Sequence, residues 1–513
     1  MPLSPPDPAV APPASSPLLA RDGRPASLVH LAGELAPYAR TGGLGEAVAS
    51  LAAYQAEAGL PTSIVMPLYQ KARARLPQLV PVTEPYEVTV GVRREAAQLF
   101  TTPDDGPPPG VGERRRPRAR HYFVANEYYF GRPGIYGEGG DYADNARRYA
   151  FFCAAAIAAL PRIAAAPLVV HAHDWHAALA PVYLRTWWAT HPYYRHASTV
   201  LSVHNAGYQG HFPPGTIPDL GLPWELFNLH QLEWYGRMNL LKGGMAFADA
   251  VVTVSPTHAE ELRTPEGGFG LHDAFRALGN RFTGIANGID QHVWDPCNDP
   301  HIAACFTRGD LSGKGKCRAE LQRAYGLPLR DDVPIFAMAA RLVWQKGLDL
   351  VLAPTGLFDL DAQFVFLGAG ERRYEDALRA WSARVPDRVR VDTQFTDEKE
   401  HRLIAGGDVL LMPCQYEPCG LTQMRAQRYG TLPLVRAVGG LADTVENGVT
   451  GFVFRAYDAG AFIACAIRAL RTFHDRRVWE AMMREAMTRD FGWARSEERY
   501  LNVYRRVMRD APA

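Results

Sequence analysis

The sequence has few cysteines, no long apolar run and almost no net charge, and each of these absences excludes a class of protein. Its seven cysteines include no CxxC pair, which argues against a disulfide framework and favours a reducing compartment, here taken to be the cytoplasm. No uninterrupted apolar stretch is long enough to span a bilayer. Lys and Arg total 55 and Asp and Glu total 54, so the chain as a whole does not attract nucleic acid or an anionic membrane. We therefore expect neither as a partner, and any anion must be bound by local groups.

Two stretches have the composition of a tail or a loop. Residues 1–26 are rich in Pro, Ala and Ser and contain no basic cluster followed by an apolar core, so we expect a disordered leader and not a secretory signal. Residues 101–120 are rich in Pro and Gly and end in a basic run at 113–120. We expect this run to be a solvated loop rather than a nucleic-acid site.

The remainder of the chain alternates short apolar runs with helical patterns, and it does so twice. In the first half, strands are expected at 27–33, 62–67, 121–127, 167–173, 199–205 and 249–255. The pattern starts again after about residue 300, with strands at 333–341, 362–370, 388–395, 408–413 and 431–440 and a helix at 347–358. Near-continuous apolar strands between helices indicate parallel sheets covered on both faces. The fold class is therefore α/β, with two doubly wound halves.

The two halves are expected to join near the segment "NGIDQHVWDP". We predict a first domain at 27–290 and a second at 291–480. The tail 481–513 has apolar residues at helical spacing and is expected to form a C-terminal helix that packs back on the first domain.

One short motif occurs in both halves. "GGLGEAV" at 42–48 and "GGLADTV" at 439–445 share Gly-Gly-Leu, a small residue, an acid and a final Val. Each follows an expected strand and could start a helix, so two such loops could face each other across a cleft. Two ordinary tight turns are the alternative.

Histidines and an acid gather at the end of the strand expected at 167–173. His171 and His173 point to the same face because strand side chains alternate, and Asp174 and His176 follow at once. His204 ends the next strand. A zinc hydrolase is one interpretation, since imidazole and carboxylate ligands cluster in this way, but the sequence offers no second ligand set. Satisfied strand-end histidines and contact with a substrate are the alternatives, and we favour the last.

Two cations follow the first strand of the second half. Arg341 and Lys346 lie in "RLVWQKG", where the carboxyl ends of strands line the ligand crevice of an open α/β sheet. Arg can grip phosphate oxygens with two donors and Lys adds a point charge. Two solvated cations opening a helix are the alternative, but cations are unfavourable at a helix start, which favours an anionic ligand.

An acid precedes a glycine-containing helix start in "EPCGLTQ" at 417–423. Gly420 permits close approach of a ligand, and the free N–H groups of 420–422 favour an anion. Glu417 should then contact whatever the anion is attached to, on its far side. A diphosphate that carries a hydroxyl-rich neutral group fits both demands. A helix start that happens to follow a surface acid is the alternative.

The motifs taken together resemble the bacterial-type glycogen synthases and plant starch synthases, which use ADP-glucose. The resemblance runs from about Ser27 to the last helix and is carried, in order, by "TGGLGE", "HYFVANEYYFGRPGIYG", "DYADNARRYAFF", "HAHDWHAALAPVYL", "SVHNAGYQGHFPP", "VVTVSPTHAEEL", "NGIDQHVWDP", "RLVWQKGLDL", "EPCGLTQMRAQRYGTLPLVRAVGGLADTV" and "NGVTGFVF". It implies the GT-B fold, in which two Rossmann-like doubly wound domains face a deep inter-domain cleft. It also implies retaining transfer of glucose from ADP-glucose to the non-reducing end of glycogen or another α-1,4-glucan, without a metal or other cofactor.

The resemblance also implies roles for single residues. Four would take part in catalysis, namely Glu417, His173, Arg341 and Lys346. The donor would be bound by Arg40, Gly42, Gly43, Arg341, Lys346, Gly420, Leu421 and Thr422. The sugar or the acceptor would be contacted by Asp174, Trp175, Asn205, Tyr129 and Tyr136.

The chain departs from the family pattern at a few positions, and these keep other interpretations open. Arg40 stands where the family has Lys, Glu46 where Asp is frequent, and Cys317 and Arg318 where Asn-Lys is usual. The competing hypotheses are a retaining transferase that uses UDP-glucose or another acceptor, a metal-dependent hydrolase, and a catalytically silent glucan-binding protein.

Overall fold

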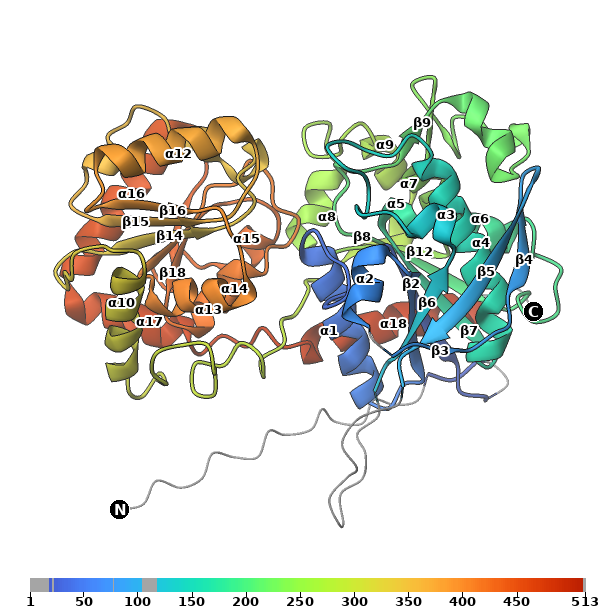
Figure 1. Cartoon of the computed structure of the whole chain (residues 1–513), viewed down its shortest axis with the longest axis horizontal. Coiled ribbons are helices and arrows are strands. Elements are labelled where there is room, and N and C mark those ends of the chain that lie inside the picture. Colours follow the sequence, from blue (N-terminus) through green and yellow to red (C-terminus); the bar gives the residue numbers. More distant parts are fainter. Residues whose placement is uncertain (1–17, 21–22, 77, 104–117, 511–513) are drawn as a thin grey trace, which may run out of the picture. The chain divides into compact units, whose positions relative to one another are not determined.

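The structure is a computed structural model, and it describes residues 18–20, 23–76, 78–103 and 118–510. The chain forms two compact units, drawn in Figure 1 and described here one at a time. The first comprises Met1–Val254, Leu262–Gly288 and Trp493–Ala513, and the second comprises Ser255–Glu261 and Ile289–Gly492. The last helix thus belongs to the first unit, whereas Ser255–Glu261, which the sequence assigns to the first half, groups with the second.

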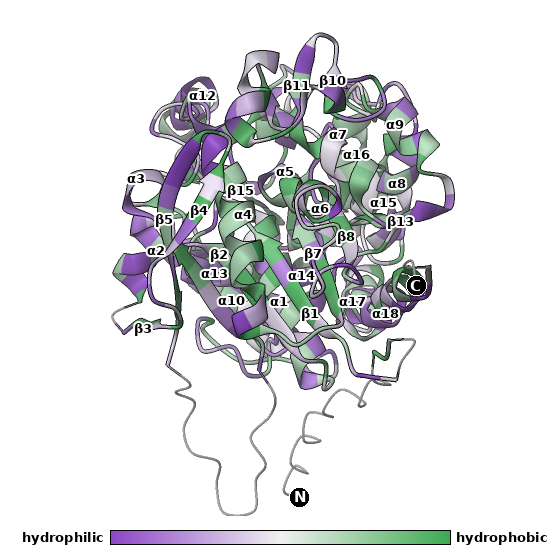
Figure 2. Cartoon of the chain, turned by 90° about the vertical axis from the view of Figure 1, so that its right-hand side faces the viewer, coloured by the Kyte–Doolittle hydropathy of each residue, from purple (hydrophilic) through white to green (hydrophobic). Residues whose placement is uncertain are grey.

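The first unit is built on a ten-stranded sheet with the order β13-β12-β8-β7-β1-β2-β6-β5-β3, in which β4 pairs with β5. The bounds are β1 Ser27–Ala32, β2 Thr62–Pro67, β3 Val80–Pro81, β4 Tyr86–Val90, β5 Arg93–Thr101, β6 Arg120–Ala125, β7 Leu168–His173, β8 Ser198–Val203, β12 Ala250–Thr253 and β13 Phe282–Gly284. Pairing is parallel from β13 to β6, as predicted, and every residue of β1, β2, β7 and β8 is buried. The pairs made by β3, β4 and β5 are antiparallel, which the sequence analysis did not predict. Figure 2 shows hydrophobic strands of the sheet in green and hydrophilic stretches of β5 in purple.

Helices cover this sheet on both faces. They are α1 Gly43–Glu57, α2 Gln70–Arg75, α3 Glu127–Phe130, α4 Asn145–Ile163, α5 Asp174–Ala177, α6 Leu179–Arg185, α7 Leu240–Phe247, α9 His272–Ala277 and α18 Ala494–Asp510. The 3-10 turn η3 Gly279–Arg281 directly precedes β13. One hydrophobic cluster joins Leu51 of α1 and Tyr504 of α18 to Leu28, Val169 and Val200 of the sheet. Both helices therefore cover the same face of the sheet. Because strand side chains alternate, the side chains two residues after Leu28, Val169 and Val200 point toward the same helices.

A segment between β8 and β12 of the first unit forms a second sheet of three strands. It has the order β10-β11-β9, with β9 His211–Phe212, β10 Glu233–Trp234 and β11 Arg237–Asn239, and the 3-10 turns η1 Pro214–Leu220 and η2 Trp224–Leu226 lie between β9 and β10.

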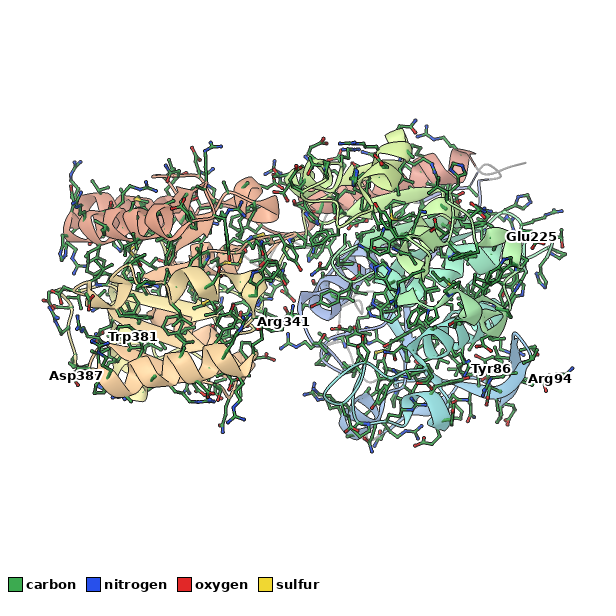
Figure 3. All side chains as sticks on the ribbon, turned by 90° about the horizontal axis from the view of Figure 1, so that it is seen from above. Tyr86, Arg94, Glu225, Arg341, Trp381 and Asp387 are labelled. Atoms are coloured by element: carbon green, nitrogen blue, oxygen red, sulfur yellow. The ribbon has the colours of Figure 1, made fainter. Side chains whose placement is uncertain are left out.

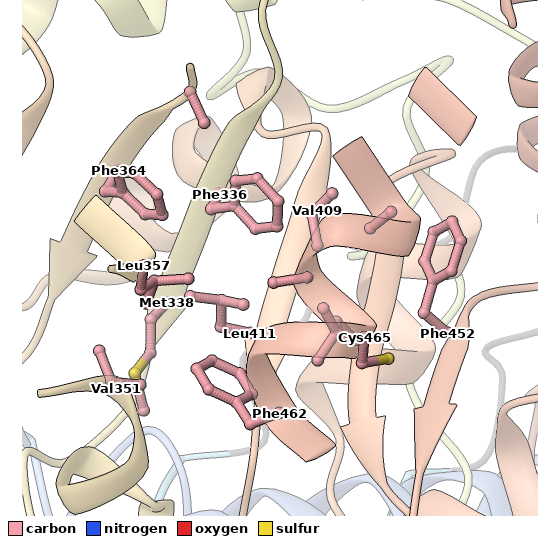
Figure 4. Close-up of a cluster of buried hydrophobic side chains, with 14 of the residues drawn as sticks. Phe336, Met338, Val351, Leu357, Phe364, Val409, Leu411, Phe452, Phe462 and Cys465 are labelled. Carbon is pink, nitrogen blue, oxygen red and sulfur yellow. The ribbon is translucent and has the colours of Figure 1, made fainter. Parts of the chain in front are cut away.

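The second unit has a six-stranded parallel sheet with the order β16-β15-β14-β17-β18-β19. The bounds are β14 Ile335–Ala339, β15 Gln363–Leu367, β16 Val389–Asp392, β17 Val409–Met412, β18 Leu432–Arg436 and β19 Phe452–Phe454. Its helices are α8 Pro256–Leu262 (all but its last residue), α10 Ser312–Ala324, α11 Leu348–Val351, α12 Arg372–Arg384, α13 Asp397–Gly406, α14 Thr422–Arg428, α15 Gly439–Thr444, α16 Ala459–His474 and α17 Arg476–Ala486. Figure 4 shows part of the core, in which Phe336, Met338 and Leu411 of the sheet lie beside Phe462 and Cys465 of α16.

The order of the strands confirms the predicted class, because in both sheets the sequence order reverses at an inner strand, as in a doubly wound fold. Such a sheet binds ligands at the carboxyl ends of its strands near the reversal. In the part of the chain that the structure describes, no helix combines the length and the apolar character needed to cross a membrane.

Two predictions are wrong in detail. The helix expected at 347–358 is broken, because Pro354 cannot donate a helical hydrogen bond and Gly356 has a φ of 78°. The expected disordered leader is too long, because Leu18 is buried in the core and Leu19 bridges to Pro25. Residues 1–17 and 21–22 of that leader, and 113–117 of the basic run, lie outside the described residues.

Candidate functional site

In the second unit, Lys346 and Glu417 form an ion pair at the carboxyl ends of neighbouring strands. Lys346 ends the 3-10 turn η4 Trp344–Lys346 that follows β14, and Glu417 lies in the loop between β17 and α14. The Cys414 Sγ lies 3.6 Å from the same carboxylate oxygen. Burial of the ammonium lowers the pKa of Lys346, but the Glu417 carboxylate, its hydrogen bond and the nearby Cys414 together raise that pKa above its usual value. The acid and the cation, which the sequence analysis put on opposite sides of a diphosphate, thus contact each other in this structure.

Next to this pair are groups that could bind an anion. The Arg341 side chain, labelled in Figure 3, is exposed, and it makes no hydrogen bond or ion pair with the residues that the structure describes. It is near enough to Lys346 for its charge to lower the lysine pKa. Among the same residues, no acceptor meets the backbone N–H groups of Gly420, Leu421 and Thr422, and Gly420 has a φ of 71° that favours glycine. One cation and three N–H groups therefore remain available to an anionic ligand.

The second glycine loop supports the backbone that carries Glu417. The N–H of Gly440 lies 3.2 Å from the Glu417 carbonyl oxygen and 3.1 Å from that of Pro418. A Cβ atom at Gly439 or Gly440 would collide with the backbone of residues 417–419. The prediction that each Gly-Gly-Leu motif starts a helix is confirmed, because α1 begins at Gly43 and α15 begins at Gly439.

In the first unit, an acid that the sequence analysis missed organises the other glycine loop. Glu34 is buried, and its carboxylate accepts hydrogen bonds of 2.7 Å from both the backbone N–H and the hydroxyl of Thr41. The Tyr136 hydroxyl donates to the same carboxylate, and Arg40 forms an ion pair with Glu46. Glu34 follows the carboxyl end of β1 by two residues, and this position in a parallel sheet is the signal that could have identified it.

The histidines of the first unit form a buried chain of hydrogen bonds. His173 is 0% exposed, its Nε2 lies 2.9 Å from Nδ1 of His30, and its Nδ1 lies 3.0 Å from Nε2 of His204. Both nitrogens of His173 are therefore occupied, and no donor or acceptor of this ring is left for a sugar. His204 is partly exposed, and no described residue meets its Nδ1.

Three of these imidazoles are close enough together to hold a metal ion. The ligand atoms offered by His30, His171 and His173 lie within 4.8 Å of one another. Each of their nitrogens is already hydrogen-bonded, however. The His30 Nε2 lies 2.8 Å from the Gln55 Oε1. The His171 Nδ1 lies 2.9 Å from the Tyr504 hydroxyl, and its Nε2 lies 2.7 Å from the Ser202 hydroxyl. A metal would have to displace several buried hydrogen bonds, and each group left unpaired costs about 1–3 kcal/mol.

His176 lies outside this cluster. It stacks on Tyr136 with ring centroids 4.8 Å apart, and its Nδ1 is buried without a hydrogen-bond partner among the residues described.

Asp174 holds the loop that carries His204. Its Oδ1 accepts the backbone N–H groups of His204 at 2.6 Å and Asn205 at 3.4 Å. Burial raises the pKa of Asp174 to about 7, although these two N–H groups oppose the rise. Asp174 has a φ of 55°, a strained conformation for a residue that is not glycine, and such strain is common at functional sites.

The other predicted contacts of sugar or glucan divide into two groups. Tyr136 and Asn205 are partly exposed beside Glu34 and Asp174. Trp175 and Tyr129 are buried, Trp175 against Tyr149 and Phe212 and Tyr129 among aromatic rings of α3 and α4. Trp175 can shape a wall, whereas Tyr129 has a packing role in this structure.

Comparison with known families and proteins agrees with this arrangement. Residues 27–277 match the family described as the starch synthase catalytic domain, and residues 325–484 match glycosyl transferases group 1. The chain is 43% identical over 485 residues to a glycogen synthase of Anaeromyxobacter sp. (strain Fw109-5), a match that covers 93% of this chain and 98% of that protein. It is 39% identical over 482 residues to a glycogen synthase of Myxococcus xanthus (strain DK1622), which covers 92% of this chain and 98% of the relative.

Solved structures point the same way. The catalytic domain of starch synthase IV from Arabidopsis thaliana, bound to ADP and acarbose, matches with a TM-score of 0.85 and 29% identity over 94% of this chain and 99% of that one. A sucrose-phosphate synthase from Thermosynechococcus elongatus matches with a TM-score of 0.59 and 17% identity over 94% of this chain and all of that one, which supports the fold alone. The GT-B fold class is confirmed, and the chain belongs to the glycogen synthase and starch synthase family of glucosyltransferases.

Proposed function

We propose that the protein transfers glucose from ADP-glucose, with retention of configuration, to the non-reducing end of glycogen or another α-1,4-glucan. The observation that carries the proposal is the group of residues at the carboxyl ends of β14 and β17. There, Arg341 and three unpaired N–H groups adjoin the Lys346–Glu417 pair. Cations and aligned N–H groups stabilise a departing diphosphate, and a carboxylate suits the hydroxyls and developing positive charge of a sugar.

In the second unit, different residues would bind different parts of the donor. Lys346 has three N–H donors, so it can hold Glu417 with one and a phosphate oxygen with another. Arg341 and the N–H groups of Gly420, Leu421 and Thr422 would take further phosphate oxygens. The C1–O bond to the diphosphate then breaks, O4 of the acceptor forms the new bond from the same face, and its proton passes to the departing phosphate oxygen. No step in this sequence requires a metal.

In the first unit, we assign contact with the sugar to His204 rather than to His173. His204 is the partly exposed ring with an unoccupied nitrogen, whereas His173 is buried with both nitrogens bonded. Asp174 would hold the loop that carries His204, and Trp175 would form part of the surface around the sugar. Asn205 and Tyr136 remain proposed contacts with sugar or glucan.

The first glycine loop is proposed to act on the donor. Arg40, Gly42 and Gly43 precede or open α1, where N–H groups are free to meet an anion. Arg40 keeps the charge of the Lys that the family has at this position, with a planar head that can form two parallel hydrogen bonds. We propose that this change leaves the preference for ADP-glucose in place, and that the reaction occurs in the cytoplasm, which suits seven free cysteines.

A donor comparison tests the proposal. Initial rates would be measured for the full chain with ADP-glucose and with UDP-glucose, using glycogen as acceptor. We expect kcat/KM to be higher for ADP-glucose, and we expect an α-1,4-specific exoglucosidase to release the transferred glucose. A higher kcat/KM for UDP-glucose would show that UDP-glucose, and not ADP-glucose, is the preferred donor. Absence of transfer from either donor, with ADP still bound, would favour a silent glucan-binding protein.

A further inference from the structure

We propose that Gln55 is a positioning residue: through His30 and His173 it fixes which nitrogen of His204 carries the proton, so that His204 presents an unprotonated Nδ1 to the substrate. The inference rests on the proposed function for what His204 contacts. The chain of hydrogen bonds itself does not depend on it.

The chain consists of three contacts that run from α1 to the end of β8. The Gln55 Oε1 lies 2.8 Å from Nε2 of His30, the His30 Nδ1 lies 2.9 Å from Nε2 of His173, and the His173 Nδ1 lies 3.0 Å from Nε2 of His204. Gln55, His30 and His173 are each 0% exposed. Water therefore does not compete for the first two of these contacts.

All three imidazoles are neutral, so each has one donor and one acceptor nitrogen. Burial lowers the pKa of His30 to about 4 and that of His204 to about 3, and it lowers the pKa of His173 well below its usual range. The neighbouring histidines lower the pKa of His173 further, because a second positive charge in the cluster would be repelled.

The direction of the chain follows from its first atom. An amide oxygen can only accept, so Nε2 of His30 carries a proton and its Nδ1 does not. The Nε2 of His173 must then be the donor to His30, and the Nε2 of His204 must be the donor to His173. The Nδ1 of His204 is then unprotonated, and its lone pair lies on the partly exposed side of the ring.

Two residues of α18 lie beside the Gln55 amide, and one of them determines which way it points. Its Nε2 lies 3.2 Å from the Tyr504 hydroxyl. Glu497, two turns earlier on the same helix, is 2% exposed, and no described residue makes a hydrogen bond of ordinary geometry with its carboxylate oxygens. Burial raises the pKa of Glu497 to about 7, and the Gln55 amide opposes this rise, as a nearby N–H donor does. The Tyr504 hydroxyl can donate or accept and so permits either orientation, whereas the ionised Glu497 carboxylate can only accept and favours Nε2 toward α18 and hence Oε1 toward His30.

An unprotonated Nδ1 has a defined chemical use at this site. It can accept a hydrogen bond from a sugar hydroxyl, whereas the opposite tautomer would offer an N–H. A site that is fixed as an acceptor loses no free energy in selecting a tautomer when the sugar binds, which is a form of preorganisation.

The first test measures the tautomer without substrate. The full chain would be labelled with 15N-histidine, and the His204 signals would be assigned by their loss in His204→Gln. We expect a protonated Nε2 and an unprotonated Nδ1 in the unaltered protein. Gln55→Leu, or Gln55→Met if the first variant does not fold, should convert His204 to a mixture of tautomers. A protonated Nδ1 in the unaltered protein, or unchanged His204 signals in both variants, would overturn the proposal.

Ser202→Ala is the matched control. Ser202 is buried in β8, two residues before His204, and its hydroxyl lies 2.7 Å from Nε2 of His171. The variant removes a hydrogen bond from the same cluster but none from the chain to His204. The His204 signals should therefore keep their pattern, and a change equal to that of Gln55→Leu would show that any loss in the cluster has this effect.

The second test separates positioning from general damage. Gln55→Leu should lower kcat/KM for the donor by about 2- to 12-fold, the value of one hydrogen bond of about 0.5–1.5 kcal/mol. In a His204→Ala background the same change should cost less than about twofold, because the residue it acts through is gone. Equal losses in both backgrounds would overturn the proposal. If the unaltered protein transfers no glucose, the proposed function fails, while the 15N signals still decide the tautomer.

Discussion

Replacement of Lys346 gives the strictest test of the site in the second unit. The side chains of Lys346 and Glu417 are 17% and 9% exposed, so neither is solvated as in a surface pair. Lys346→Met leaves the carboxylate buried beside the Cys414 thiol, without a cation in contact with it. Breaking a buried pair costs about 3–5 kcal/mol, whereas an exposed pair is worth about 0–1 kcal/mol. Because a part of this pair reaches water, we expect a loss of about 3 kcal/mol.

Calorimetry of three variants measures this loss. A loss of about 3 kcal/mol corresponds to a fall in Tm of about 6–12 °C for a unit of this size. The double variant Lys346→Met, Glu417→Gln buries no charge, so most of the loss should be recovered, while Glu417→Gln alone should resemble Lys346→Met. A double variant that is no more stable than either single variant would refute the buried-charge reasoning. ADP binding by the same proteins completes the test, since Lys346→Met should weaken it and Glu417→Gln should not.

Three further outcomes follow from the structure. Burial raises the folded-state pKa of Glu497 to about 7, above an unfolded value of about 4.3, so its ionised form destabilises the first unit. Glu497→Gln should therefore raise the free energy of unfolding at pH 8 by up to about 3 kcal/mol, with the gain fading as the pH falls toward about 4, and denaturation at several pH values would contradict this if the gain were constant. Gly440→Ala places a Cβ against the Cys419 backbone and should cost about 1–3 kcal/mol and lower kcat, whereas Gly315→Ala, with nothing within 4 Å of the new atom, should be neutral or stabilising in a melting experiment. A chelator in excess should leave the initial rate unchanged, and a loss that added zinc restores would favour the metal hypothesis.

Local sequence was enough to predict most of the strands. The segments around Val29, Val170 and Leu410 are short apolar runs between helical patterns, and all of them are buried in parallel strands. The antiparallel strand β5 was harder to predict, because only two of its nine residues, Ala97 and Leu99, are buried and no continuous apolar run marks it. The helix expected at 347–358 ignored a proline and a glycine that interrupt it, so the error lies in turn chemistry rather than in tertiary structure.

The candidate site in the second unit was predictable because its parts follow strand ends directly. Lys346 comes seven residues after β14, and Glu417 comes five residues after β17, in neighbouring strands of one parallel sheet. The topology alone brings these side chains to the same edge. Their direct ion pair was not predictable, because the sequence says nothing about side-chain orientation or about whether a ligand separates the two groups.

The hydrogen-bond partners of the histidines could not be predicted from local sequence. Alternation along β7 put His171 and His173 on one face, but it could not show that the partners on that face come from α1 and α18. Tyr504 contacts both Gln55 and His171, from 449 and 333 residues away in the chain. The polar core of the first unit is therefore complete only when the helix that follows the second unit in sequence has packed against the sheet. Any change that loosens α18 should act on the histidine chain, and through it on His204, without touching a residue that contacts substrate.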